Sequence, residues 1–181
     1  MASEHPWWGP ARVPFLLLTP ACMALGVAWS AWQLAQQGLS LNALDALLCV
    51  LGALAAHVAV NALNEHHDFR SGLDQRTQRT PFSGGSGVLP ANPSLAPVAW
   101  AMGWGALLFT VLTGLYFVVS RPALLWDLAP LGLVGVAVVV SYTPWLTRHP
   151  WLCLMAPGLG FGPLMLLGTE VVLTGAMSWQ G

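Results

Sequence analysis

Lysine is absent from this chain of 181 residues, and charge of either sign is scarce. Only 7% of the residues are charged, whereas a soluble domain carries roughly 25%. So little charge cannot cover the surface of a water-soluble domain of this size, so we expect lipid to be the solvent. The net charge of −1 also excludes a nucleic-acid binder, because such a protein needs a basic stripe.

Paired cysteines are lacking as well. Cys22, Cys49 and Cys153 all lie inside apolar runs, and none belongs to a CxxC pair. An isolated cysteine in an apolar run is typical of a buried, inert thiol. The sequence therefore predicts three buried, unreactive cysteines.

What the chain has instead is five apolar segments, each near or above the roughly 20 residues that a helix needs to cross a bilayer. They cover residues 13–35, 43–66, 95–119, 123–142 and 151–174. Several tryptophans lie near the predicted span ends, as is typical of membrane interfaces: Trp7, Trp8, Trp126, Trp145, Trp151 and Trp179. The sequence thus predicts an all-α fold, a polytopic transmembrane helix bundle of about five spans.

The arginines predict the orientation of this bundle. With five crossings, one face receives Arg12, Arg70, Arg76, Arg79 and Arg148. The other face receives Arg121 alone. Because cytoplasmic loops carry the excess of basic residues, we expect the N-terminus in the cytoplasm. The only long connection, residues 68–93, then lies on the cytoplasmic side, and long loops of this kind are usually functional or disordered.

The second apolar segment ends in a ladder of polar side chains. Spacings of 4, 3 and 4 residues put four of them on one helix face: His57, Asn61, Asn64 and Asp68. Glu65 flanks the same face. Polar groups inside a membrane normally face the bundle interior or a water-filled cavity. Asn64 and Asp68 can direct two oxygens at one hard cation, and Mg²⁺ suits such a site because it shares substrate phosphates.

The connection that follows adds arginines and glycines at the same end. It contains Arg70, Asp74, Arg76, Arg79 and the run Ser83-Gly84-Gly85-Ser86-Gly87. Arginine pairs with phosphate through parallel hydrogen bonds, and a glycine-rich backbone can present N–H groups to phosphate. Carboxylates, arginines and glycines at one membrane surface indicate a polyanion with an apolar tail, and a prenyl diphosphate fits that description.

Each feature taken alone has a plainer explanation. His57 alone is more often a satisfied interior histidine, and Asn61 alone is equally well a contact between helices. His66 and His67 are expected to face headgroups. The glycine run alone is typical of a flexible loop, and the arginines alone could anchor the topology. The combination, in this order at one membrane face, is what favours a site.

The segment Asn64-Glu-His-His-Asp68-Phe-Arg-Ser-Gly-Leu-Asp74 resembles the first aspartate-rich motif of the UbiA superfamily of intramembrane prenyltransferases. Its spacing is most like the branch that prenylates 1,4-dihydroxy-2-naphthoate on the route to menaquinone. Residues 80–87 are similar to the stretch that follows this motif, and residues 141–144 and 160–169 also resemble segments of that branch. The resemblance covers essentially the whole chain.

The resemblance implies Mg²⁺-dependent transfer of an isoprenyl group from a prenyl diphosphate to an aromatic quinone precursor, in a bacterial or archaeal cytoplasmic membrane. It implies the catalytic residues Asn64, Asp68 and Asp74, with Glu65 as a further metal ligand where the family usually has aspartate. The expected substrate-binding residues are His57, Asn61, Arg70, Arg76, Arg79, Ser83, Gly84 and Gly85. The metal and the arginines would draw charge onto the leaving diphosphate.

The resemblance also points to a missing part. The family has about nine membrane helices and a second aspartate-rich motif on the sixth, whereas the only acidic residue after Asp127 is Glu170. We therefore expect residues 1–181 to form a single, C-terminally incomplete prenyltransferase-like domain, which self-association or a partner could complete. The alternatives are a non-catalytic or truncated member that keeps the fold and ligand binding, and a small membrane transporter that uses the polar ladder.

Overall fold

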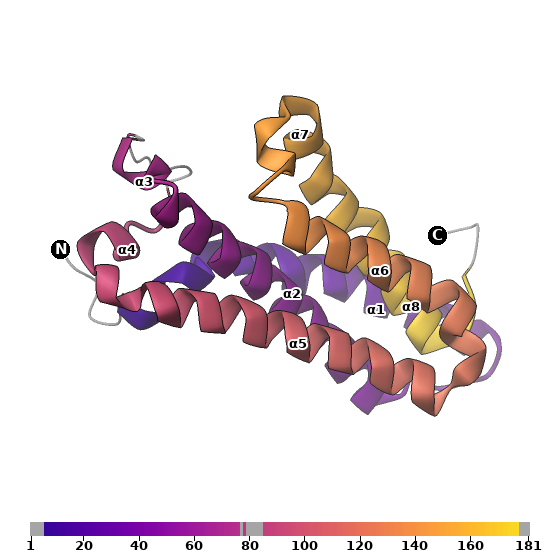
Figure 1. Ribbon diagram of the computed structural model, residues 1–181. Coiled ribbons are helices and arrows are strands. Elements are labelled where there is room, and N and C mark those ends of the chain that lie inside the picture. Colours follow the sequence, from indigo (N-terminus) through magenta and orange to yellow (C-terminus); the bar gives the residue numbers. More distant parts are fainter. Residues whose placement is uncertain (1–5, 77, 79–84, 178–181) are drawn as a thin grey trace.

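A computed structural model describes residues 6–76, 78 and 85–177 (Figure 1). The longer helices of this described part are α1 (Leu18–Gln36), α2 (Ala43–Arg70), α5 (Ala96–Ser120), α6 (Leu125–Ser141), α7 (Pro150–Leu159) and α8 (Met165–Thr174). Short helical turns connect them: η1 (Pro6–Ala11), η2 (Val13–Leu17), α3 (Leu73–Arg76), α4 (Val88–Ala91), η3 (Pro93–Leu95), η4 (Pro122–Leu124), η5 (Leu146–Arg148) and η6 (Gly160–Leu164). No strand occurs in these described residues.

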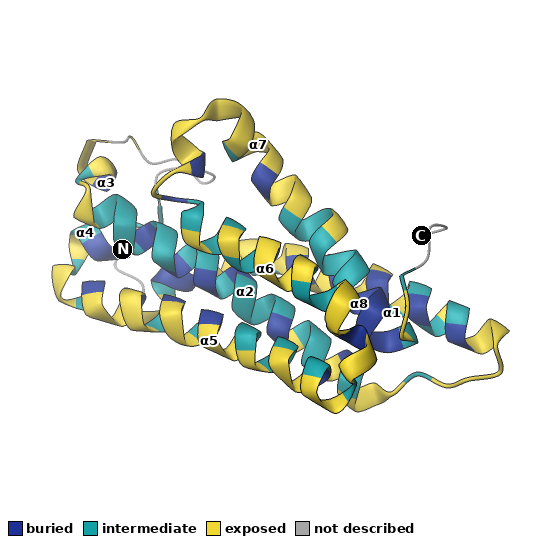
Figure 2. Cartoon of the chain, turned by 45° about the vertical axis from the view of Figure 1, so that its right-hand side comes forward, coloured by how far each residue is buried: buried dark blue, intermediate teal, exposed yellow. Residues whose placement is uncertain are grey.

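Five of the described helical segments are long and apolar enough to cross a membrane. They are Trp7–Gln36, Ala43–Arg70, Pro93–Ser120, Pro122–Ser141 and Pro150–Thr174. The predicted all-α, polytopic bundle is therefore confirmed, and the chain is an integral membrane protein. The outward faces of α5, α6 and α7 are largely exposed (Figure 2), as expected of apolar helix faces that border lipid.

The central helix, α2, owes its bounds to local sequence. At its start the Asn42 side chain accepts hydrogen bonds from the backbone N–H groups of Leu44 and Asp45, at 3.0 and 3.2 Å, as N-cap residues do. After its end, Gly72 adopts a positive φ of 73°, which turns the chain sharply and favours glycine. Because α2 continues to Arg70, the polar ladder stays helical as far as Asp68.

The helix α5 lies along α2 for most of its length (Figure 1). Small residues allow this close approach, as is usual between membrane helices. A Cβ at Gly103 of α5 would lie only 2.7 Å from Cγ of Leu63 on α2. Further along, the Thr110 hydroxyl of α5 donates a hydrogen bond to the carbonyl oxygen of Gly52, at 3.1 Å.

In the last span, α7 passes into α8 through the π turn η6. Pro157 and Pro163 lie within this span, and each proline lacks the N–H that would bond to the preceding helical turn. A π turn is a local widening of a helix and is frequently found at functional sites. The widening lets the chain pass Pro163 and continue as one span. Gly26 of α1 packs against Leu166 and Thr169 of α8.

Polar contacts also hold the end of the bundle where α2 begins. Arg121 pairs with Asp45, with 3.2 Å between Nη2 and Oδ2, and donates from Nη1 to the Val172 carbonyl oxygen at 2.7 Å. Nearby, the buried Glu170 carboxylate accepts hydrogen bonds from Trp29 Nε1 at 3.0 Å and Gln33 Nε2 at 2.5 Å. These contacts join the ends of α1, α2, α5 and α8.

The cysteines are free thiols, but the prediction that they are buried is wrong. All three are only half-buried, because in a membrane protein an apolar run can border lipid or a cavity as readily as a packed interior. Cys49 borders the cavity described below. Cys153 lies with its Sγ 4.0 Å from the Tyr142 hydroxyl.

We predict that Gly103→Ala destabilises the protein by about 1–3 kcal/mol, because its Cβ would overlap Leu63 and push α5 away from α2. At this size each kcal/mol lowers Tm by about 2–4 °C, so thermal unfolding of the detergent-solubilised chain would detect the change. Gly105→Ala is the matched control, because no atom lies within 4 Å of its Cβ position. An equal loss in both variants would contradict close α2–α5 packing at Gly103.

Candidate functional site

A cavity of about 900 Å³ lies between α2, α5, α6 and the η6–α8 segment. Along α2 its lining runs from Cys49 to Asp68. At 1.5 Å per residue this distance is about 28 Å, close to the thickness of the hydrocarbon core of a bilayer. The cavity therefore extends along most of the bundle.

The cavity is charged at one end only. Its charged side chains are Arg12, Asp68 and Asp74, and all three lie where α2 leaves the bundle. The remaining length is mostly apolar, with representative lining residues Leu107, Val111, Leu128, Val136 and Phe161. A space with this distribution suits a ligand that has an ionic head and a long apolar tail.

The polar ladder of α2 faces this cavity, as its helical spacing predicts: His57, Asn61, Asn64 and Asp68 all line it. His57 is buried, and its Nδ1 shares a hydrogen bond with the Thr19 hydroxyl of α1 at 2.8 Å. Its ring stands edge-on to Phe161 of η6, with ring centroids 4.6 Å apart. The ladder thus reaches both α1 and the last span.

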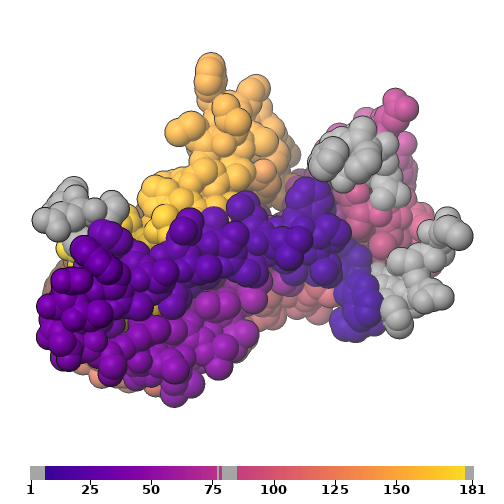
Figure 3. Space-filling model, turned by 180° about the vertical axis from the view of Figure 1, so that it is seen from behind, coloured from indigo at the N-terminus to yellow at the C-terminus, as the bar shows by residue number. Residues whose placement is uncertain are grey.

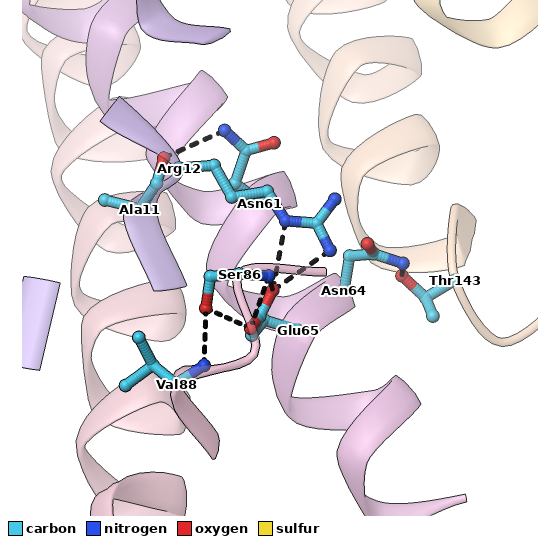
Figure 4. Close-up of polar contacts among 8 residues, drawn as sticks. All are labelled: Ala11, Arg12, Asn61, Asn64, Glu65, Ser86, Val88 and Thr143. Carbon is cyan, nitrogen blue, oxygen red and sulfur yellow. Dashed lines mark hydrogen bonds and ion pairs between the residues drawn. The ribbon is translucent and has the colours of Figure 1, made fainter. Parts of the chain in front are cut away.

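Two asparagines of the ladder bind other segments of the chain (Figure 4). Asn61 donates from Nδ2 to the carbonyl oxygen of Ala11, at 3.0 Å. Asn64 donates from Nδ2 to the Thr143 hydroxyl in the connection after α6, at 3.1 Å. Because its amide nitrogen donates this hydrogen bond, the amide oxygen of Asn64 is the atom that could coordinate a cation.

Glu65 points to a different place from the ladder and does not line the cavity. Its side chain is fully buried. Oε2 lies 3.0 Å from both Nε and Nη2 of Arg12. The Ser86 backbone N–H donates to both carboxylate oxygens, at 2.9 and 3.0 Å, and the Ser86 hydroxyl donates to Oε1. Figure 4 shows Glu65 enclosed by these two residues.

Arg12 is a residue of this site that the sequence did not indicate. It is the only arginine lining the cavity in the part of the chain that the structure describes. Its backbone is left-handed, with φ 52° and ψ 54°, which is uncommon for a residue other than glycine. A lone arginine before an apolar run is typical of a topology anchor, and nothing near it in the sequence signals a partner 53 positions away.

Gly85 borders the polar end at a point where a side chain would be strained. Its φ is +69°, and a Cβ there would lie 3.1 Å from Asp74 Oδ1, 3.2 Å from Glu65 Oε2 and 3.5 Å from Arg12 Nη2. The predicted loop residue Asp74 is buried in the short helix α3. The glycine therefore lets the chain pass between these three charged groups.

Other predicted site residues are not brought to the cavity in the described structure. Arg70 and Arg76 are exposed and do not line it. Arg79, Ser83 and Gly84 lie outside the described residues. The phosphate-binding roles expected of these five residues therefore stay predictions, as does the metal role expected of Glu65.

The polar end fits a magnesium ion that shares its coordination with a substrate. Asn64, Asp68 and Asp74 are the oxygen-bearing groups that the sequence predicts as ligands, and all three line this end. Among the described residues no group of three or more His, Cys, Asp or Glu side chains could hold a metal alone. Mg²⁺ needs no such cage, because it commonly takes one or two carboxylates together with phosphate oxygens and water.

Tyr142 lines the cavity beside this end, just after α6. Burial, together with the neighbouring Cys153, raises the pKa of its phenol above the ordinary value. A phenol is neutral near pH 7 even at its ordinary pKa, so Tyr142 can serve as a hydrogen-bond donor or acceptor.

We predict that Thr19→Val lowers the stability by about 1 kcal/mol, because it leaves Nδ1 of the buried His57 without its partner within the membrane. Thermal unfolding would show this as a fall in Tm of about 2–4 °C. Thr113→Val is the control, because in the described part of the chain the Thr113 hydroxyl bonds to the Phe109 carbonyl oxygen of its own helix and to no other helix. Equal effects of the two substitutions would mean that the contact between α1 and α2 contributes nothing.

Comparison with protein-family models, with curated proteins and with solved structures finds no match for this chain. The functional argument therefore depends on the cavity and on the groups that line it.

Proposed function

We propose that the chain binds an isoprenyl diphosphate and takes part in Mg²⁺-dependent transfer of its prenyl group to an aromatic quinone precursor of the 1,4-dihydroxy-2-naphthoate type. On this proposal it is a prenyltransferase of the UbiA superfamily. The observation that carries the proposal is the cavity of about 900 Å³, charged at one end and apolar along the bundle. A prenyl diphosphate has the same division between head and tail.

The charges at the polar end favour a diphosphate that arrives with a cation. Asp68 and Asp74 would repel a bare diphosphate, and the single positive charge of Arg12 is already paired with Glu65. Asn64, Asp68 and Asp74 are the residues that would hold Mg²⁺ between protein and phosphate. Bound there, Mg²⁺ would neutralise charge on the leaving diphosphate. Arg12 would bind the phosphate oxygens directly, as arginine side chains commonly do.

The apolar length of the cavity would hold the prenyl tail away from water. On α6 it is lined by Gly132 and Gly135, and no atom lies within 4 Å of a Cβ built at either position. These glycines leave room beside the tail. Phe161 presents an aromatic ring to this apolar part, next to His57. A ring face there can stabilise positive charge on an allylic carbon.

Transfer would break the bond between the allylic carbon and the diphosphate oxygen and form a bond from that carbon to the acceptor ring. The ring would then lose a proton to the departing diphosphate or to water. Tyr142 and His57 line the cavity and can hydrogen-bond the hydroxyl groups of such an acceptor. We place the polar end, with Arg12, Arg70 and Arg76, at the cytoplasmic face, because basic residues are in excess on that side. The N-terminus would then be cytoplasmic.

A second candidate is a protein that binds the diphosphate without transferring the prenyl group. It is favoured by the distribution of acidic groups, because both carboxylates that line the cavity, Asp68 and Asp74, come from α2 and α3. Within the described residues, α5, α6 and α8 add none. Two-metal sites hold a phosphoryl group from both sides, so transfer would need further ligands from a second copy or a partner.

We predict that the purified chain binds a non-hydrolysable farnesyl thiolodiphosphate in the presence of Mg²⁺, and that Asp68→Asn weakens this binding about tenfold or more by removing a metal ligand. Isothermal titration in nanodiscs, with and without EDTA, would measure it. Asp127→Asn is the matched control, because Asp127 is exposed near the start of α6 and does not line the cavity. No binding by the unaltered chain, or equal binding by both variants, would contradict the proposal.

The same preparation separates the two candidates. Labelled prenyl diphosphate and dihydroxynaphthoate should yield prenylated product if the chain is a transferase, and Asp68→Asn should abolish that product. Tight, Mg²⁺-dependent binding without product would favour the binding protein.

We also predict that Gly132→Phe reduces affinity for a geranylgeranyl probe more than for a geranyl probe, because the new ring would occupy the space beside a long tail. Gly158→Phe is the control, since Gly158 has the same open surroundings but does not line the cavity. If both probes lost affinity equally, the tail would lie elsewhere.

A further inference from the structure

The Glu65 carboxylate joins three segments that are far apart in the sequence. It stands on α2, it pairs with Arg12 after η1, and it accepts hydrogen bonds from Ser86 in the turn before α4. Arg12 lines the polar end of the cavity, and so does Gly85 next to Ser86, although Glu65 itself does not. Figure 4 shows the three segments meeting at this one side chain.

Further contacts hold the N-terminal segment in the same place. The Ala11 carbonyl oxygen accepts the hydrogen bond from Asn61. Gly9 fits against Val88, whose Cγ2 would lie only 2.2 Å from a Cβ at position 9. Figure 3 shows η1, η2 and α1 as an indigo-to-purple band across this face, with α8 in yellow above it. The N-terminal segment is therefore packed between α2 and the turn at residues 85–88.

The pairing with Glu65 sets the direction of the Arg12 guanidinium. Nε and Nη2 face the same carboxylate oxygen, each at 3.0 Å. Because the guanidinium is planar, fixing two of its nitrogens fixes the third as well, while Arg12 still lines the cavity. Its left-handed backbone, at φ 52°, is unfavourable for a residue with a side chain and needs contacts of this kind to hold it.

We propose that Glu65 is a positioning residue that clamps the N-terminal segment and the turn at residues 85–88 onto α2, and so holds Arg12 at the polar end of the cavity. Its effect on the ligand rests on the proposed function, whereas the clamp itself does not. In this role Glu65 acts through Arg12 and Ser86. The sequence instead predicts that Glu65 binds the metal, and the two roles differ in what a substitution would change.

The clamp is tested without any ligand by hydrogen–deuterium exchange of the full chain. Glu65→Gln should make the backbone amides of residues 6–12 and 85–88 exchange about tenfold faster, because both segments lose their shared anchor. Glu170→Gln is the matched control, because Glu170 is also a buried, hydrogen-bonded carboxylate but lies at the opposite end of the bundle. Unchanged exchange in Glu65→Gln would overturn the proposal, and so would equal acceleration in both variants.

If Glu65→Gln does not fold, Ser86→Ala gives an independent test. It removes one contact of the clamp from the side of the turn, and it should still speed exchange at residues 11–12, which Ser86 reaches through Glu65 and Arg12. Gly9 is left out of this comparison, because Ser86 Oγ lies 3.4 Å from its Cβ position. Acceleration confined to residues 85–88 would overturn the proposal.

The role in ligand binding is tested with farnesyl thiolodiphosphate and Mg²⁺. Glu65→Gln should raise the Kd of the probe about tenfold, while the Mg²⁺ concentration for half-saturation, measured with each variant near its own probe Kd, stays unchanged. A large rise in that Mg²⁺ concentration would mark Glu65 as a metal ligand and overturn the positioning role. Should the unaltered chain not bind the probe, the proposed function fails, and the exchange experiment still decides whether the clamp exists.

Discussion

Polar groups that enter the hydrocarbon region of a membrane must find partners within the protein, and this requirement organises the whole molecule. The hydrophobic effect gives little preference for one packing of the helices over another, because lipid tails are as apolar as the helices. The polar side chains of α2 do favour one packing, because several of them have a partner on another element. His57 reaches α1, Asn61 the N-terminal segment, and Asn64 the connection after α6. Hydrogen bonds from α2 therefore hold three of the elements around the cavity in place.

The parts that could be predicted from the sequence follow from composition and helical period. Scarce charge and five apolar runs indicated the five spans, which the structure has. The spacing of the ladder from His57 to Asp68 indicated one inward face, and all four side chains line the cavity. Both predictions need only the geometry of a single helix and the polarity of its solvent.

The parts that could not be predicted depend on contacts between distant segments. Glu65 is next to Asn64 in the sequence, yet it turns away from the cavity towards Arg12 and Ser86. No local pattern distinguishes a carboxylate that binds an arginine from one that binds a metal. In the same way, nothing in the glycine run singles out Gly85 as the residue enclosed by three charged groups.

The crowding around Gly85 has a consequence for how this protein can vary during evolution. A Cβ there would crowd Asp74 and Glu65 and touch Arg12, at a positive φ that favours glycine. Every substitution at this position is therefore strained. Arg12 and Glu65, by contrast, should be substituted together, because the loss of either leaves the other charge without its partner inside the protein. In homologous chains, positions 12 and 65 should therefore covary across 53 residues while position 85 stays fixed.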